Sequence, residues 1–175
     1  MMDKVLLAGF GGQGVMFIGK VMAYAGMLGG LEVCWIPSYG PEMRGGTANC
    51  SVIIADDEIN SPVIEKADAG IVLNQPSYDK FLHRIKPGGV LVVNSSIIEL
   101  GTKRDDIEII AIPAGEIANG LGNPGLANMV CLGALINKMK LIKLPHIEKA
   151  MAAIVGKKKP EMYESNLAAI QQGLA

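Results

Sequence analysis

Four glycines within six residues, Gly9, Gly11, Gly12 and Gly14, form the part of this sequence best suited to chemistry. Three of them follow the spacing G-x-G-x-x-G, which joins a strand to a helix in nucleotide-binding proteins. Residues without a Cβ atom let backbone N–H groups approach a phosphate closely, and a following helix adds free N–H donors and the positive end of its dipole. The spacing therefore predicts a phosphate-binding loop.

The neighbours of this loop agree with that interpretation. A strand-like apolar run begins at Lys4 before the glycines, and a helix-like run, 15–28, follows them. The same pattern can arise in any tight strand-to-helix turn, so a loop that binds nothing stays open as an alternative. The extra glycine at position 12 favours binding.

Two common nucleotide sites are disfavoured. An NAD site needs an acidic residue at the end of the second strand, about 20 residues further on. Here the second strand-like run, 31–37, ends in Ile36 and Pro37, and Glu32 lies at its beginning. A methyltransferase site usually has an acidic residue just before the glycines, where this chain has Leu7 and Ala8.

A second glycine-rich loop, 38–46, follows that strand and is predicted to lie at the same, carboxyl edge of the sheet as the first loop, where open α/β sheets bind ligands. Arg44 offers a planar bidentate donor for a phosphate or carboxylate, and Gly45 and Gly46 come directly after it. Glu42 could orient Arg44 or contact another subunit. A surface turn with an incidental Glu/Arg pair is the alternative.

Composition limits the function classes. The chain has 175 residues, half of them hydrophobic and 19% charged, against a usual charged share of about 25%. This apolar character indicates a surface that meets a partner. A net charge of −1 gives no reason to expect nucleic acid. The basic run at 157–159 is interpreted as a solvated turn. With no membrane span and no signal-peptide layout, we expect a cytoplasmic protein.

No residues stand out as catalytic or metal-ligating. Cys34, Cys50 and Cys131 are far apart and form no C-x-x-C pair, so the chain alone is not expected to hold zinc or an iron–sulfur cluster. His83 and His146 are isolated, without partners for a triad. We expect the cysteines to be buried apolar residues.

The order of the apolar runs predicts one domain, 1–175, with a three-layer α/β/α fold and a mostly parallel, Rossmann-like sheet. A strand at 47–55, a turn at Asp56 and Asp57 and a return at Glu58 and Ile59 predict an antiparallel hairpin. Further strands are expected at 69–74, 90–94 and 107–112, with helices at 77–85, 124–140, 145–155 and 161–172.

Three segments together carry a family resemblance: the first glycine loop 9–15, the second loop 38–47 and the segment 128–134. In this order they resemble the gamma subunit of 2-oxoacid:ferredoxin (acceptor) oxidoreductases, most of all the 2-oxoglutarate type. The resemblance covers essentially the whole chain. A single G-x-G-x-x-G motif would not have been specific enough.

The resemblance implies a multi-subunit enzyme that converts a 2-oxoacid and coenzyme A to an acyl-CoA and CO₂ and passes electrons to ferredoxin. It implies alpha, beta and in some cases delta partner subunits, with thiamine diphosphate between alpha and beta and iron–sulfur clusters on beta or delta. The gamma domain is associated with coenzyme A, and this chain by itself is expected to be inactive. Pyruvate, branched-chain and aryl-pyruvate substrates stay open beside 2-oxoglutarate.

Combined with the predicted phosphate loop, the resemblance assigns the coenzyme A diphosphate to Gly11, Gly12, Gln13 and Gly14 and its neutralisation to Arg44. Gly9, Gly45 and Gly46 are assigned to the same cofactor site. No catalytic or metal-binding residue is assigned. Two alternatives remain: a stand-alone nucleotide-binding enzyme, and a structural scaffold subunit with an empty glycine loop.

Overall fold

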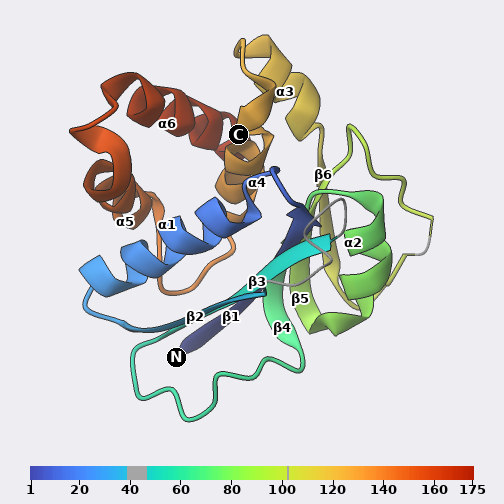
Figure 1. Cartoon of the computed structure of the whole chain (residues 1–175). Coiled ribbons are helices and arrows are strands. Elements are labelled where there is room, and N and C mark those ends of the chain that lie inside the picture. The colour runs from blue at the N-terminus through green and yellow to red at the C-terminus, as the bar shows by residue number, and fades with distance from the viewer. Residues whose placement is uncertain (39–46, 102) are drawn as a thin grey trace.

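A computed structural model describes residues 1–38, 47–101 and 103–175. Its centre is a six-stranded sheet in the order β2-β3-β1-β4-β5-β6 (Figure 1). The strands are β1 (Met2–Phe10), β2 (Glu32–Ser38), β3 (Thr47–Ala55), β4 (Ala67–Val72), β5 (Ile85–Asn94) and β6 (Glu108–Ile112).

The helices connect these strands and form the C-terminal region. They are α1 (Val15–Leu28), α2 (Gln75–Phe81), α3 (Ala114–Gly120), α4 (Ala127–Ile136), α5 (Leu144–Met151) and α6 (Pro160–Leu174). Short 3-10 turns at Leu82–Arg84 and Pro124–Leu126 adjoin α2 and α4, and a π-helical turn, Ala152–Gly156, ends α5. Among the described residues, no helix combines the length and apolar character that crossing a membrane requires.

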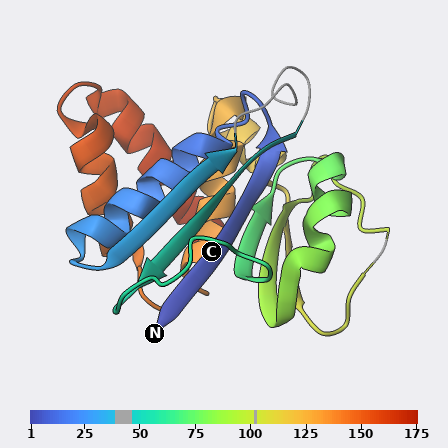
Figure 2. The same cartoon turned by 60° about the horizontal axis from the view of Figure 1, so that its bottom comes forward.

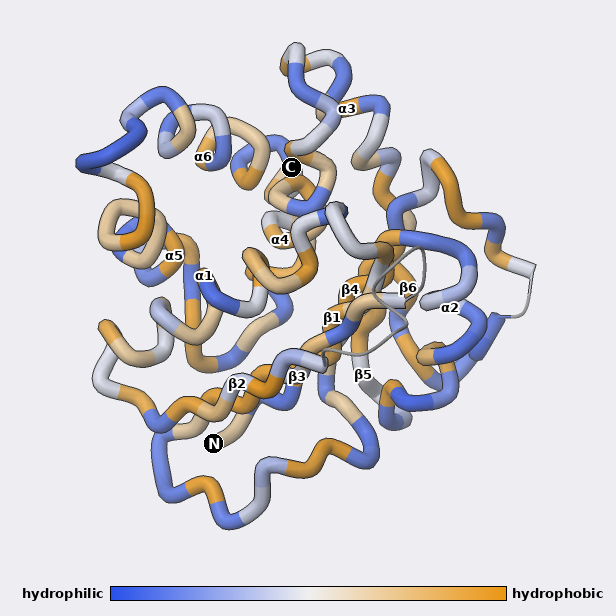
Figure 3. Tube along the Cα trace, in the orientation of Figure 1, coloured by the Kyte–Doolittle hydropathy of each residue, from blue (hydrophilic) through white to orange (hydrophobic). Residues whose placement is uncertain are grey.

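The helices cover both faces of the sheet, which confirms the predicted α/β/α layers (Figure 2). On β1, Val5 and Leu7 belong to the core beneath α1, α4, α5 and α6, whereas Leu6 and Ala8 belong to the core beneath α2. The stretch of β1 that is buried on both faces, Val5–Ala8, is apolar, and the hydrophobic residues in Figure 3 follow the central strands.

Strand β3 alone runs against the other five strands, since it pairs antiparallel with both β1 and β2 while β1–β4, β4–β5 and β5–β6 are parallel. The predicted return strand at Glu58 and Ile59 is wrong. Both edges of β3 are already hydrogen-bonded, because β2 pairs along one side and β1 along the other. The antiparallel insertion in the sheet is therefore β3 itself, placed between β1 and β2.

The expected helices are present with shifted ends, and one helix was not predicted. That helix, α3, is only seven residues long and contains Gly115 and Gly120, so its sequence has a weak helical preference. It is held from outside, because Asn94 Oδ1 accepts the Gly115 N–H at 3.3 Å and Ser96 Oγ accepts the Glu116 N–H at 3.2 Å.

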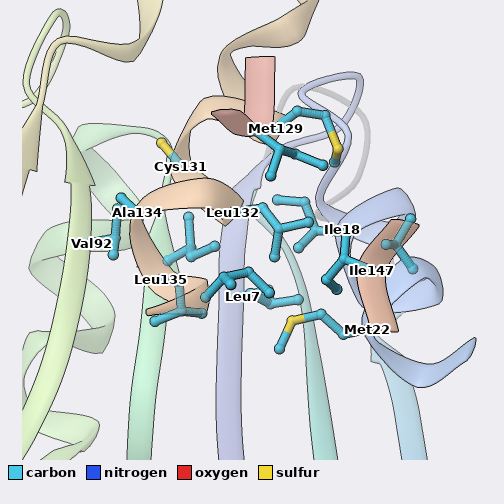
Figure 4. Packing of buried hydrophobic residues seen from close by; sticks show 14 of the residues in the cluster. Leu7, Ile18, Met22, Val92, Met129, Cys131, Leu132, Ala134, Leu135 and Ile147 are labelled. Carbon is cyan, nitrogen blue, oxygen red and sulfur yellow. The ribbon is translucent and has the colours of Figure 1, made fainter. Parts of the chain in front are cut away.

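Helix α4 is apolar on all sides and lies at the centre of the larger core. Figure 4 shows its side chains between the sheet and α1, among them Met129, Leu132 and Leu135, which pack near Leu7 and Ile18. Its outer side meets α6 backbone to backbone. A Cβ atom on Gly133 would lie 2.1 Å from the carbonyl oxygen of Ile170, so only glycine allows this approach.

The contact between α4 and α6 gives the first prediction. Gly133→Ala should lower the free energy of unfolding by about 3 kcal/mol, because the added methyl group forces the two backbones apart. Gly120→Ala, where an added Cβ atom meets nothing within 4 Å, is the control and should change stability by less than about 0.5 kcal/mol. Urea denaturation of both variants measures the difference, and equal stability would contradict the close contact.

Candidate functional site

The candidate site lies where the chain leaves β1 and β4 in opposite directions. These two strands are parallel neighbours, and Val5–Ala8 pair with Ala69–Val72. From β1 the chain passes through α1 to β2 on one side of the sheet, and from β4 it passes through α2 to β5 on the other side (Figure 1). Such a divergence opens a crevice at the carboxyl ends of the strands, where α/β proteins bind ligands.

The first glycine loop lies at this crevice and is fixed by Gln13. The backbone N–H of Gln13 donates to Phe10 O at 3.1 Å, and its side-chain Oε1 accepts the Phe10 N–H at 2.6 Å. The side-chain Nε2 donates to Leu73 O at the end of β4, at 3.1 Å. Gln13 therefore closes the loop on itself and ties it across the crevice.

The glycines of the loop have different physical reasons to be glycine. At Gly9 a Cβ atom would lie 2.8 Å from Gln13 Oε1, and at Gly14 it would lie 2.2 Å from Asn128 Nδ2. Gly12 has a positive φ of 94°, yet a Cβ atom there would meet nothing within 4 Å. A side chain at position 9 would displace Gln13, and at position 14 it would displace Asn128 and also strain the positive φ of 81°. Gly12 instead faces open space and leaves room for a ligand.

The start of α1 supplies hydrogen-bond donors to this space. Gly14 is the N-cap residue, and the Ile18 N–H donates to Gly14 O at 3.1 Å. The N–H groups of the first turn before Ile18 have no carbonyl partner within the helix, and the helix dipole places partial positive charge there. The loop and the helix start together make an anion-binding geometry.

A cavity of about 240 Å³ adjoins the loop. Its walls come from the glycine loop, from the ends of β4 and β5, and from the start of α4: Gly12, Gln13, Leu73, Asn94, Pro124, Gly125, Ala127 and Asn128. All of these residues are uncharged. The described part of the cavity therefore offers amides and backbone N–H groups, which suit a phosphate or an amide-bearing ligand but supply no full positive charge.

Asn94 and Asn128 are site residues that the motif analysis did not assign. Asn128 Nδ2 donates to Gly14 O at 3.3 Å and so joins α4 to the glycine loop, 114 residues away in the sequence. Asn94 ends β5 and holds the start of α3. Asn128 did belong to a segment on which the family resemblance rests, but nothing local in the sequence marks either amide as a ligand contact.

The second predicted loop lies in part outside the described residues. Arg44, Gly45, Gly46 and Glu42 belong to residues 39–46, which the structure does not describe. The strands that flank this segment are described. Ser38 ends β2, and Thr47 starts β3 and pairs with Phe10 at the end of β1, so both flanking residues stand at the same edge of the sheet as the glycine loop.

At the end of β4, Asn74 starts helix α2. Its Oδ1 accepts the Ser77 N–H at 3.0 Å, the bond that an N-cap side chain makes. At the end of β2 stands Ser38, and Glu32 lies at the opposite edge of the sheet, as expected. The carboxylate that an NAD ribose would need is therefore missing from the end of that strand.

The described groups with shifted pKa values lie away from the cavity. Burial raises the pKa of the Cys50 thiol to about 11 and that of Cys131 to about 12, so both are the buried, unreactive cysteines that the sequence predicts. Burial also raises the pKa of Tyr78, and hydrogen bonding between Arg104 and Asp106 lowers the pKa of that carboxyl. None of these described groups lines the cavity.

The Gln13 contacts give the second prediction. Gln13→Met removes both side-chain hydrogen bonds at similar volume and should lower the free energy of unfolding by about 1–2 kcal/mol. The Phe10 amide should then exchange its hydrogen faster. Gln13→Glu keeps the acceptor for Phe10 and loses the donor to Leu73, so the Phe10 amide should stay protected. Hydrogen exchange followed by NMR measures this, with Gln172→Met on the exposed side of α6 as control; unchanged exchange in Gln13→Met would refute the contact.

Comparison with known proteins identifies relatives of this chain. The chain is 37% identical over 133 residues to the ketoisovalerate oxidoreductase subunit VorA of Methanothermobacter marburgensis, covering 76% of this chain and 28% of that protein. It is 35% identical over 176 residues to the 2-oxoglutarate synthase subunit KorC of Methanocaldococcus jannaschii, covering 99% of this chain and 92% of KorC. The chain thus spans little more than a quarter of VorA but nearly all of KorC.

Solved structures agree in fold. The gamma subunit of the keto/oxoacid ferredoxin oxidoreductase from Geobacter sulfurreducens superposes with a TM-score of 0.83 at 31% identity, covering 98% of this chain and 95% of that one. The 2-oxoglutarate:ferredoxin oxidoreductase of Magnetococcus marinus, solved with 2-oxoglutarate, coenzyme A and succinyl-CoA bound, superposes with a TM-score of 0.88 at 24% identity, covering 99% of this chain and 30% of that one. This second likeness shows the shared fold.

The family described as pyruvate ferredoxin/flavodoxin oxidoreductase matches residues 4–175. This match confirms the resemblance that the two glycine loops and the segment 128–134 indicate. Together with KorC and the Geobacter gamma subunit, which align with this chain over nearly their whole length, it establishes that the chain belongs to the pyruvate ferredoxin/flavodoxin oxidoreductase family.

Proposed function

We propose that this chain, as a single gamma-type domain of residues 1–175, is the gamma subunit of a multi-subunit 2-oxoacid:ferredoxin oxidoreductase. The complex would convert a 2-oxoacid and coenzyme A to an acyl-CoA and CO₂ with reduction of ferredoxin. The observation that carries the proposal is the glycine loop, whose Gly12 borders open space at the N-terminus of α1. Near-complete coverage of KorC and of the Geobacter gamma subunit supports the subunit assignment.

The loop fits the diphosphate of coenzyme A on three counts. The positive φ of Gly12 turns the backbone without placing a side chain in the open space. The first turn of α1 presents N–H donors to anionic oxygen atoms. The uncharged cavity beside the loop has amide groups from Asn94 and Asn128, which match a ligand that is itself rich in amides.

The role of this chain is to bind and orient coenzyme A. Gln13 holds the loop in shape, the backbone N–H groups hold the diphosphate, and Arg44 from the neighbouring segment neutralises it. Thiamine diphosphate would supply the decarboxylation chemistry and iron–sulfur clusters the electron transfer, both on the alpha, beta or delta subunits. The isolated chain is accordingly proposed to be inactive.

For the substrate we propose 2-oxoglutarate. The support is the relative KorC, which this chain matches over 92% of the length of KorC. VorA, named for ketoisovalerate, is slightly more similar over a shorter segment, and relatives named for indolepyruvate and pyruvate also match. A stand-alone nucleotide-binding enzyme is disfavoured, because β2 ends in Ser38 and not in the acidic residue that an NAD ribose needs. The described walls of the cavity also carry no charged side chain that could act as a catalytic group. A scaffold with an empty loop is the alternative that the next experiment separates.

The third prediction tests the loop in the assembled complex. Gly12→Val places a branched side chain in the diphosphate space, so the KM for coenzyme A should rise at least about tenfold while the KM for the 2-oxoacid is unchanged. Gly30→Val is the matched control: Gly30 also has a positive φ, 75°, and open surroundings, but it lies between α1 and β2 at the opposite edge. A normal KM for coenzyme A in Gly12→Val would favour the scaffold alternative.

The fourth prediction concerns Arg44. A charge-assisted contact with phosphate contributes roughly 1.5–3 kcal/mol, so Arg44→Ala should raise the KM for coenzyme A about ten- to a hundredfold. Arg44→Lys should recover part of this loss, because the charge remains and the bidentate geometry does not. Steady-state kinetics and gel filtration are measured together. Dissociation of the complex with unchanged KM would make Arg44 a subunit contact instead.

A further inference from the structure

A cysteine thiol lies beneath the first turn of α1. Cys50 belongs to β3 and is 1% exposed, and its thiol donates to the carbonyl oxygen of Val15 at 3.7 Å between Sγ and O. Burial raises the pKa of this thiol to about 11, so it stays protonated at neutral pH and keeps the hydrogen that it donates. Val15 is the first residue of α1, directly after the glycine loop. The thiol therefore contacts the end of the helix that presents donors to a ligand.

Glycine at position 19 makes room for this contact. A Cβ atom on Gly19 would lie 2.6 Å from Trp35 Nε1 and 2.8 Å from Cys50 Sγ, so the indole and the thiol lie against the same point of α1. Glycine has a weak preference for helix interiors, and any larger residue here would push both groups away from the helix. The absence of a side chain at position 19 thus has a local physical reason.

The Trp35 indole supports the thiol from β2. Its Nε1 is buried, and no regular hydrogen bond satisfies it among the described residues. The interaction that it makes is a weak hydrogen bond to the Cys50 thiol, which acts against the larger effect of burial on the pKa of that group. Sulfur is a weak acceptor, so the contact falls short of regular geometry. With the indole N–H on its sulfur, the thiol hydrogen is left to point at Val15 O.

The Val15 carbonyl shares a peptide group with the Met16 N–H. The peptide is planar, so a hydrogen bond that fixes the Val15 oxygen also fixes the direction of this N–H. Met16 stands in the first turn of α1, where N–H groups have no carbonyl partner within the helix, and it lines a hollow together with Gly11 and Gly12. A hydrogen bond to a carbonyl also polarises its peptide group and makes the N–H a stronger donor.

We propose that Cys50, supported by Trp35, positions the Met16 N–H for an anionic ligand of the glycine loop. The inference rests on the proposed function of that loop. Cys50 and Trp35 are positioning residues, because neither lines the hollows at the loop and both act through the first peptide group of α1. The contacts run from the edge strand β2 through β3 to the start of the helix.

The first test is kinetic and uses the assembled complex. Cys50→Ala removes the thiol donor, so the KM for coenzyme A should rise about two- to tenfold, as for the loss of one neutral hydrogen bond, with kcat and the KM for the 2-oxoacid unchanged. Cys50→Ser keeps a donor and should recover part of the loss. Cys131→Ala is the matched control, because Cys131 is a fully buried cysteine of the same core but belongs to α4, and the KM should stay normal.

The second test detects the contacts without a ligand. Trp35 is the only tryptophan of the chain, so its indole N–H gives a single NMR signal in the isolated full chain. Cys50→Ala should shift that signal and the Met16 amide signal, whereas Cys131→Ala should leave both in place. Trp35→Phe removes the indole N–H and should shift the Met16 amide signal in the same direction by a smaller amount.

The two measurements separate the contacts from their role. Unchanged Trp35 and Met16 signals in Cys50→Ala would overturn the contacts themselves. Shifted signals with a normal KM for coenzyme A, or an equal rise of KM in Cys131→Ala, would overturn the positioning role and leave the proposed function standing. A normal KM in Gly12→Val would instead refute the glycine loop as the ligand site, and the positioning role would fall with it.

Discussion

The parallel pairing of β1 with β4 is the contact on which the rest of the structure depends. It is continued beyond the strands, because the Leu73 N–H donates to Ala8 O at 2.9 Å and Gln13 Nε2 donates to Leu73 O. The two chain directions diverge at this point, so the crevice between α1 and α2 follows from the pairing. The glycine loop has its shape because one side chain, Gln13, bonds to both sides of the divergence.

Close packing on one side of the sheet brings distant segments to this crevice. Helix α4 can lie at the centre of the core because Gly133 and Gly173 let its backbone touch that of α6. The start of α4 then lies against the glycine loop, where Asn128 bonds to Gly14 O. The same packing brings the first turns of α6 and Phe17 of α1 to the walls of one hollow beside the glycine loop. Gly133 and Gly173 thus position site residues indirectly, because they allow α4 and α6 to pack closely.

The candidate site is built from uncharged polar groups. The cavity at the loop is uncharged among its described residues, and its polar atoms are amides and backbone groups. Fixed dipoles of this kind hold an anionic ligand without introducing an ionisable group that could take part in proton transfer. Among the described residues, charged side chains stand outside this cavity, as do the exposed lysines at 157–159 before α6. This arrangement agrees with the proposed role of the loop in binding coenzyme A.

The sequence by itself determined the local features of this protein. The glycine spacing predicted the strand, loop and helix from Lys4 to Leu28, and the apolar runs predicted the layers, because both depend on neighbouring residues. It could not determine that β3 lies between β1 and β2, since partner choice depends on which strand edges remain free. Nor could it place Asn94 and Asn128 in the site, or show that the Gln13 side chain hydrogen-bonds to Phe10 and Leu73. Those roles join residues far apart in the chain, and only the packed tertiary structure brings their polar atoms within hydrogen-bond distance.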